Sequence, residues 1–236
     1  MTTSSWLTSA GLVILGYLFG SISPSVFLGR AFKGIDVRKV GSGNAGTTNA
    51  FRALGVKLGV AVLVGDLVKG VVPVVVARLV LHEHHPVVIV MVAFGCILGH
   101  NYSIFLRGKG GKGVATGAGA ALALMPVPMA IVVGIFVFLL LVVRIVSIAS
   151  IAATIMYPVM AAVFQRPLAY IVGACVMAAV VLWAHRGNFR RLWNRQEPRV
   201  KFFWNKAENG GPRPGAESAA GGPPGSPPGD PGAAAG

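Results

Sequence analysis

The sequence has little charge, and very little of that charge is acidic. Only 12% of its 236 residues are charged, and 21 Lys and Arg face 7 Asp and Glu, which leaves a net charge of +14. An average soluble domain has about 25% charged residues, whereas 54% of this chain is hydrophobic. The shortage of charge excludes an ordinary soluble domain and indicates a membrane protein.

Cysteine is also scarce. The two that are present, Cys96 and Cys175, lie in separate apolar runs, and their spacing matches no metal site. The chain also lacks the carboxylate clusters that hold metal ions beside phosphate groups. We therefore predict that both cysteines are buried by packing, and that the protein uses neither a metal nor a cofactor.

Two further features are missing. The basic residues follow no recognition-helix or aromatic-platform pattern, so nucleic-acid binding is not expected. The first ten residues carry no Lys or Arg, so the first apolar run is expected to be a retained span and not a cleaved signal peptide.

Apolar runs make up most of the chain, and each is near the about 20 residues that cross a bilayer. Two prolines, Pro126 and Pro128, divide the longest run into a short helix and a longer one. The sequence predicts an all-α integral membrane protein, a bundle of about seven transmembrane helices. The predicted segments are 7–27, 58–81, 86–106, 114–125, 129–143, 145–164 and 168–185. A version with five crossings stays open and has the same ends.

The basic residues are placed asymmetrically between these segments. Most lie in 28–57, in 107–113 and after residue 185, which seven crossings put on one side; Arg78 and Arg166 lie on the other. Because loops rich in Lys and Arg stay in the cytoplasm, we expect the N-terminus outside and the C-terminus inside. We divide the chain into a membrane domain, 1–206, and a Pro/Gly/Ala-rich tail, 207–236, that is too poor in apolar residues to fold.

A glycine-rich loop, GSGNAGTTNAFR at 41–52, lies on the predicted cytoplasmic side. Its G-x-G-x-x-G spacing matches a dinucleotide fingerprint, but apolar helices follow it where soluble βαβ units would be needed. Its backbone amides, hydroxyls and Arg52 suit an anion with several oxygens. A merely flexible loop remains the alternative.

A second loop, GKGGKGVAT at 108–116, leads directly into a predicted helix. A helix N-terminus favours anions because its N–H groups are unpaired. Neither loop is an ATP-binding P-loop, since Val114 and Thr47 stand where the lysine would be required. ATP hydrolysis is therefore not expected.

Polar residues also collect where apolar runs end on this side. They are His100-Asn101-Tyr102, the pair Ser147 and Ser150, and 185–188 with Arg191 and Glu197. Polar groups at membrane depth usually face a protein interior or a cavity, so their gathering at one level suggests a site. Asp66 and Lys69, three apart, are expected to form a buried ion pair that locks helix packing. A proton or substrate role for that pair is the alternative.

The stretches GSGNAGTTNAFR, GHNYSIFLRGKGGKGVAT and HRGNFRRL, with the run 66–70 and Ser147/Ser150, resemble the bacterial acyl-phosphate glycerol-3-phosphate acyltransferases, the PlsY family. The resemblance covers about residues 10 to 200. It implies a multi-pass enzyme of the bacterial inner membrane with its active site on the cytoplasmic side. The implied reaction moves a fatty acyl group from acyl phosphate to the 1-hydroxyl of sn-glycerol 3-phosphate, giving lysophosphatidate and phosphate in phospholipid biosynthesis. Loose association with other phospholipid-synthesis enzymes is a further expectation.

The resemblance also implies site residues. His185, hydrogen-bonded to Ser42, would orient or deprotonate the attacking hydroxyl, and a substrate phosphate oxygen remains the alternative proton acceptor. Ser42 and His185 are thus the expected catalytic residues. The expected substrate- and phosphate-binding residues are Gly41, Gly43, Asn44, Gly46, Thr48, Asn49, Arg52, Lys109, Gly110, Gly111, Lys112, Gly113, Ser147, Ser150 and Asn188. No histidine has an Asp five positions on, so an H-x4-D dyad is excluded.

The competing interpretation is a small membrane transporter or lipid scramblase. Transporters tend to bind substrate near the bilayer midplane and to contain internal repeats. Here the polar clusters gather at one membrane face, and we find no repeat. The pattern therefore favours the enzyme.

Overall fold

A computed structural model of the chain describes residues 3–82 and 84–200, and all the regular structure in these residues is helical. The elements are α1 (Thr3–Ser21), α2 (Pro24–Lys33), η1 (Val37–Lys39), α3 (Thr47–Leu54), α4 (Val56–Leu81), α5 (Pro86–Asn101), η2 (Ile104–Leu106), α6 (Val114–Leu124), α7 (Pro126–Val143), α8 (Val146–Val163), α9 (Leu168–Ala184) and α10 (Arg186–Trp193). The all-α prediction is confirmed. The predicted tail, 207–236, lies outside the described residues.

Five helical segments of the described chain are long and apolar enough to cross a bilayer, or six if α9 and α10, bent by 56°, form one span. All seven predicted apolar segments contain a helix, yet α6 has only 11 residues and reaches about 16 Å at 1.5 Å per residue. The structure therefore supports a multi-pass membrane protein but does not confirm seven crossings.

The first predicted segment, 7–27, is not one straight helix. α1 ends at Ser21 and α2 begins at Pro24. Proline lacks the N–H that would continue the helix and disfavours helical geometry at the residue before it, and Ser23 has φ −112° and ψ 94°. The break at Ile22 and Ser23 brings polar backbone into the bundle.

Glycines bring two helix pairs into close contact. Where α1 packs on α5, a Cβ at Gly99 would overlap the carbonyl oxygen of Tyr17. Where α4 packs on α6, a Cβ at Gly119 would overlap the carbonyl oxygen of Leu67, and one at Gly70 that of Thr116. Small residues at such crossings let helix backbones approach in membranes. These crossings fix α5 against α1 and α6 against α4, and the glycine-rich loop at 108–113 lies in the connection from α5 to α6.

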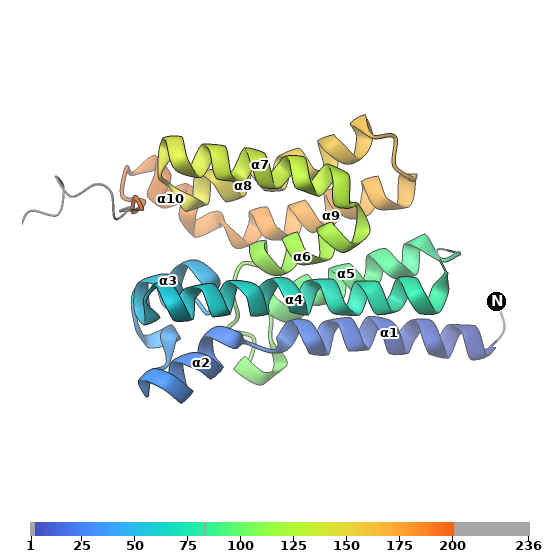
Figure 1. Ribbon diagram of the computed structural model, residues 1–236, viewed down its shortest axis with the longest axis horizontal. Coiled ribbons are helices and arrows are strands. Elements are labelled where there is room, and N and C mark those ends of the chain that lie inside the picture. Colours follow the sequence, from blue (N-terminus) through green and yellow to red (C-terminus); the bar gives the residue numbers. More distant parts are fainter. Residues whose placement is uncertain (1–2, 83, 201–236) are drawn as a thin grey trace, which may run out of the picture. The chain divides into compact units, whose positions relative to one another are not determined.

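The short helices α2, α3 and α10 gather at one end of the bundle, opposite the end at which α1 begins (Figure 1). Two of them, α3 and α10, were not predicted, because eight residues each give too short an apolar pattern. α3 is bounded by glycines, with Gly46 before it and Gly55 at φ +85° after it.

The two cysteines differ in their surroundings. Cys96 on α5 is buried, as predicted, but Cys175 on α9 is exposed, so the prediction of burial is wrong there. In an apolar helix of a membrane protein the outer face is apolar too, so an apolar neighbourhood in the sequence does not separate the two cases.

Candidate active site

The first glycine-rich loop lies between η1 and α3, and Asn49 shapes it from beneath. The side-chain oxygen of Asn49 accepts a hydrogen bond from the Ser42 N–H at 2.9 Å, and its NH2 group donates to the carbonyls of Val37 and Val40 at 2.8 and 3.0 Å. Asn49 is only 2% exposed. Its role in the structure is thus to hold the loop, with its hydrogen bonds made inside the protein.

Glycine is required in this loop by its backbone angles. Gly41 and Gly43 have φ of +63° and +69°, which residues with a Cβ rarely adopt. The side-chain oxygen of Asn44 accepts from the Gly46 N–H at 2.9 Å and closes a local turn. Ser42 lies exposed between the two glycines. The loop leads into the first turn of α3, where Thr48 is half-buried.

The second glycine-rich loop folds back over the end of α5. The Gly110 N–H donates to the Asn101 carbonyl at 3.2 Å, and the Gly111 N–H to the His100 carbonyl at 3.0 Å. A Cβ at Gly111 would overlap the His100 imidazole, so only glycine fits there. Gly113, at φ +81°, precedes the first residue of α6. Lys109 is exposed, while Lys112 turns inward.

Lys112 connects this loop to α10. Its ammonium group donates to the side-chain oxygen of Asn188, whose NH2 group donates to Glu197 at 2.6 Å. Arg191 pairs with the other Glu197 oxygen at 2.7 Å. Burial alone would raise the pKa of Glu197, but the hydrogen bonds from Arg191 and Asn188 outweigh it and hold that pKa below its usual range.

The pKa of Lys112 shows which other charged residues lie near it. Burial, followed by the positive charges of Arg191 and Arg52, lowers the pKa of Lys112 to about 8, against the attraction of Glu197. Arg52 comes from α3 and Arg191 from α10. Two arginines from separate elements therefore act on Lys112, and this concentration of positive charge favours a nearby anion.

His185 lies at the junction of α9 and α10 and is 2% exposed. Its Nδ1 is 2.8 Å from the Val181 carbonyl oxygen. Because a carbonyl only accepts, Nδ1 carries the hydrogen, and Nε2 of the neutral ring is left to accept a proton. The expected hydrogen bond between Ser42 and His185 is absent from the part of the chain that the structure describes.

Ser147 and Ser150 are buried in the first turns of α8. Ser147 contributes to the lowered pKa of Glu197 and so lies near the group of Lys112 and Asn188, while its buried hydroxyl makes no hydrogen bond among the described residues. The structure thus brings together Arg52, Lys112, Ser147 and Asn188 from four separate elements.

The sequence motifs do not single out several buried polar residues. Asn101, 6% exposed, has no hydrogen-bond partner for its side-chain amide among the described residues. A Cβ at Gly113 would lie 2.7 Å from its oxygen, so the amide faces the start of α6. Glu197 and Arg191 were noted only as neighbours of the site. The sequence signal for Asn101 is its position as a polar residue at the end of an apolar run, in His100-Asn101.

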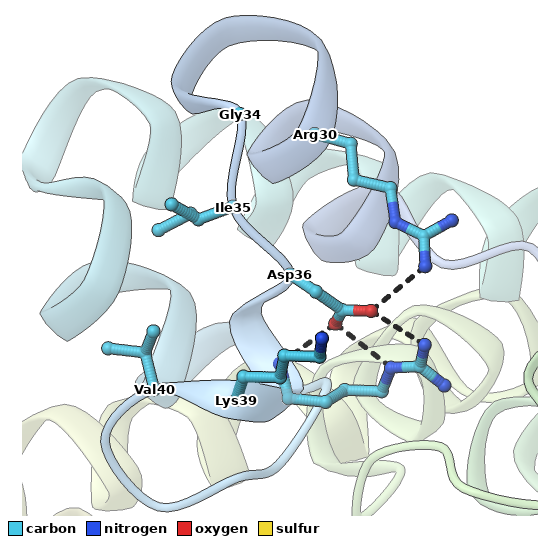
Figure 2. Close-up of a pocket in the computed structure, with 7 residues that line it drawn as sticks. Arg30, Gly34, Ile35, Asp36, Lys39 and Val40 are labelled. Atoms are coloured by element: carbon cyan, nitrogen blue, oxygen red, sulfur yellow. Dashed lines mark hydrogen bonds and ion pairs between the residues drawn. The ribbon is translucent and has the colours of Figure 1, made fainter.

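A hollow of about 560 Å3 lies apart from these residues, beside α2 and η1 (Figure 2). Asp36 in its wall pairs with Arg30 at 2.9 Å and with Arg38 at 2.7 Å. The hydrogen bond from Arg38 is the main reason that the pKa of Asp36 lies well below its usual range. The arginines here already have a carboxylate partner, and no predicted site residue lines the hollow.

Comparison with known proteins identifies the family. The model of the family described as glycerol-3-phosphate acyltransferase matches residues 10–195. The chain belongs to this family. A glycerol-3-phosphate acyltransferase of Rubrobacter xylanophilus is 40% identical over 85% of this chain and 98% of its own length. The corresponding protein of Bacillus subtilis is 38% identical over 81% of this chain and 97% of its own length.

Comparison with solved structures supports the same family. The crystal structure of PlsY (YgiH), an integral membrane glycerol 3-phosphate acyltransferase, in its glycerol 3-phosphate form is 37% identical, with a TM-score of 0.78 over 82% of this chain and 96% of that one. Its lysophosphatidic acid form is 36% identical, with a TM-score of 0.76. The resemblance predicted from the motifs is therefore confirmed, and the family of enzymes replaces the transporter as the interpretation of the bundle.

Proposed function

We propose that this protein transfers a fatty acyl group from acyl phosphate to the 1-hydroxyl of sn-glycerol 3-phosphate, giving 1-acyl-sn-glycerol 3-phosphate and inorganic phosphate. Membership of the glycerol-3-phosphate acyltransferase family supports the acceptor. The observation that carries the proposal is the half-buried Lys112, in the loop that leads into α6, with the positive charges of Arg52 and Arg191 acting on it. Such a cationic group suits substrates that both carry phosphate.

In the proposed reaction the 1-hydroxyl oxygen attacks the acyl carbonyl carbon, and the bond from that carbon to the phosphate oxygen breaks. Phosphate leaves with the bonding electron pair. The hydroxyl proton passes to Nε2 of His185 or to a substrate phosphate oxygen. Because acyl phosphate is already activated, positioning and charge stabilisation of the leaving phosphate supply most of the acceleration.

The site residues divide by chemistry. Backbone amides of both glycine-rich loops, with Arg52, Lys109 and Lys112, are proposed to hold the phosphates. Neutral hydrogen bonds come from Ser42, Asn44, Thr48, Ser147, Ser150 and Asn188. Asn49 is proposed to act indirectly, since its side chain is occupied in holding the first loop. No step requires a metal ion or cofactor.

The location follows from the charge pattern. We propose that the C-terminus and both glycine-rich loops lie on the cytoplasmic side of a bacterial inner membrane. These are the segments rich in Lys and Arg, and such segments stay in the cytoplasm. An apolar hollow of about 300 Å3 between α1 and α5, lined by Tyr17, Phe94 and Leu98 among others, is proposed to hold acyl carbons.

The decisive experiment uses the detergent-purified protein with sn-glycerol 3-phosphate and, in parallel, palmitoyl phosphate or palmitoyl-CoA. Phosphate release and lysophosphatidate are followed together. Product from palmitoyl phosphate alone is expected. Product from palmitoyl-CoA alone would overturn acyl phosphate as the proposed donor. If the folded protein makes no product from either donor, the proposed function is overturned.

A matched pair of variants tests the site within the same assay. Lys112→Met removes the half-buried ammonium, whereas Lys39→Met makes the same change at an exposed position outside it. We expect Lys112→Met to lose at least about 100-fold in kcat/KM, in line with the loss of a charge-assisted contact in a desolvated site. Lys39→Met should stay within about twofold of the wild type.

A further inference from the structure

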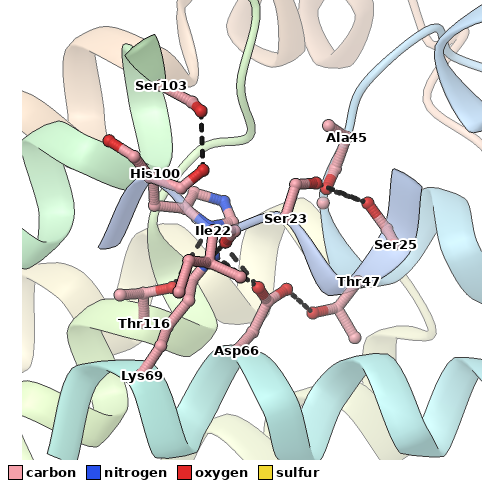
Figure 3. A network of polar contacts seen from close by, with 12 residues as sticks. Ile22, Ser23, Ser25, Ala45, Thr47, Asp66, Lys69, His100, Ser103 and Thr116 are labelled. Carbon is pink, nitrogen blue, oxygen red and sulfur yellow. Dashed lines mark hydrogen bonds and ion pairs between the residues drawn. The ribbon is translucent and has the colours of Figure 1, made fainter. Parts of the chain in front are cut away.

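A buried carboxylate lies between the two glycine-rich loops. Asp66, in the middle of α4, is 1% exposed. One of its oxygens accepts a hydrogen bond from the Thr47 hydroxyl at 2.8 Å (Figure 3). Thr47 is the first residue of α3 and follows the first loop directly. Asp66 therefore fixes the point where that loop enters its helix.

The other Asp66 oxygen pairs with Lys69, one turn along α4, at 2.9 Å. The Lys69 ammonium also donates to the Ile22 carbonyl at 2.7 Å. Ile22 lies in the break between α1 and α2, where the helical ladder leaves backbone carbonyls without partners. The predicted buried ion pair is thus confirmed, and it has further partners on both sides.

His100 continues the contacts of Asp66 toward the second loop. Its Nδ1 lies 3.6 Å from the Asp66 oxygen that pairs with Lys69 and 3.1 Å from the Thr116 hydroxyl oxygen. Thr116 is in the first turn of α6 and follows the second loop. The opposite edge of the His100 ring lies against Gly111, where a Cβ would overlap Nε2. One imidazole therefore contacts the second loop at Gly111 and the helical turn that follows the loop at Thr116.

Two helix backbones pack closely beside these contacts. Gly70 lies close to Asp66 along α4, and a Cβ on Gly70 would overlap the Thr116 carbonyl oxygen. α4 and α6 thus meet backbone to backbone beside the network, and a displacement of one is transmitted to the other because packed interiors leave little room for independent movement. In the lower dielectric of the interior, hydrogen bonds to a charged group are also stronger than in water.

We propose that Asp66, with His100, is a positioning group that couples the two glycine-rich loops, so that the geometry of one loop sets that of the other. The inference rests on the proposed function, in which both loops hold substrate phosphates. None of the coupling side chains needs to touch substrate. Their effect is on the relative placement of the two phosphates, on which transfer between bound substrates depends steeply.

The test is a double-mutant cycle between Thr47→Val and Thr116→Val, which remove one hydroxyl at each end of the network and keep the side-chain shape. For independent loops the two losses in kcat/KM multiply. Residues that share one hydrogen-bonded network depart from that rule. We expect the double variant to lose at least about threefold less than the product of the single losses, because breaking either end already releases both loops.

A matched cycle serves as the control. Thr154→Val makes the same chemical change on α8, where the Thr154 hydroxyl donates to the Ser150 carbonyl within its own helix at 2.7 Å. Combined with Thr47→Val it is expected to give multiplicative losses. The melting temperature of every variant in detergent is measured in parallel, because a purely structural role would change stability without linking the two loops kinetically.

A second background keeps the proposal testable if the single variants prove too weak. Asp66→Leu combined with Lys69→Met removes both buried charges together and also the acceptor of the Thr47 hydroxyl, which breaks the network without leaving one charge uncompensated. In this background the cycle between Thr47 and Thr116 should become multiplicative. Multiplicative losses already in the wild-type background would overturn the coupling. A wild-type protein that makes no lysophosphatidate would instead overturn the proposed function, so the two failures are distinct.

Discussion

At the scale of single residues, the ionisation of Lys112 has a measurable consequence. Its pKa of about 8 means that the ammonium is charged below pH 8 and becomes neutral above it. Substrate phosphate is already fully ionised there, since its second pKa is about 6. We expect kcat/KM for the phosphate substrates to fall as pH rises above 8, by up to about tenfold per pH unit, because kcat/KM reports the free enzyme.

The variant Lys112→Arg distinguishes this residue from other titrating groups. Arginine stays charged up to about pH 12, so the high-pH decline should move upward or disappear even if activity at pH 7 is lower. A decline that stays at the same pH in this variant would assign it to another group. The measurement is a pair of kcat/KM profiles between pH 6 and pH 10.

Asn188 gives a second prediction at this scale. Its side chain bridges Lys112 and Glu197. The change Asn188→Asp would place a further negative charge beside Glu197 and would form an ion pair with Lys112. We expect at least about 100-fold loss in kcat/KM, because a like charge in a buried site is costly and the cation is no longer available to phosphate. The same change at the exposed Asn194 is the control, and equal losses in both variants would refute the role of Asn188.

The residue scale also shows what the sequence left undetermined. The motifs predicted Arg52, Lys112 and Asn188, which the structure brings together, because each stands in a polar stretch next to a long apolar run. They did not reveal that Asn49 makes its hydrogen bonds within the protein, or that His185 bonds to Val181 and not to Ser42. Side-chain partners distant in the sequence depend on packing, which no local pattern contains.

At the scale of helices, length decided what could be predicted. The long apolar helices α4 and α8 begin and end within two residues of the predicted segments, since about 20 apolar residues leave few other choices. α3 and α10 are short and carry the polar site residues, so their sequences read as loops. The break between α1 and α2 was marked only by Pro24, whose effect an apolar run conceals.

The crossing of α4 and α6 gives a prediction at this scale. Gly119→Ala would place a methyl group against the Leu67 backbone, which cannot move as a side chain would. We expect a cost of about 1–3 kcal/mol in the free energy of unfolding. Gly134→Ala on α7 meets nothing within 4 Å and should gain up to about 1 kcal/mol from helix propensity. Thermal unfolding in one detergent measures both, and an equally stable Gly119→Ala would argue against the close crossing.

At the scale of the whole molecule, the remaining question is which way the bundle faces. The charge pattern favours a cytoplasmic position for the glycine-rich loops, which the geometry of a helix bundle does not test. The two ends of α4 provide probes, because its 26 residues extend about 39 Å. Lys57 near one end and His84 just past the other are both exposed.

Single cysteines at these positions should therefore react from opposite sides of the membrane. In a Cys175→Ala background, which removes the exposed thiol, we expect a membrane-impermeant maleimide added to intact spheroplasts to label His84→Cys but not Lys57→Cys. Labelling of Lys57→Cys should appear only after the membrane is opened. The reverse pattern would invert the bundle and place both glycine-rich loops outside, where a cytoplasmic acyl phosphate could not reach them.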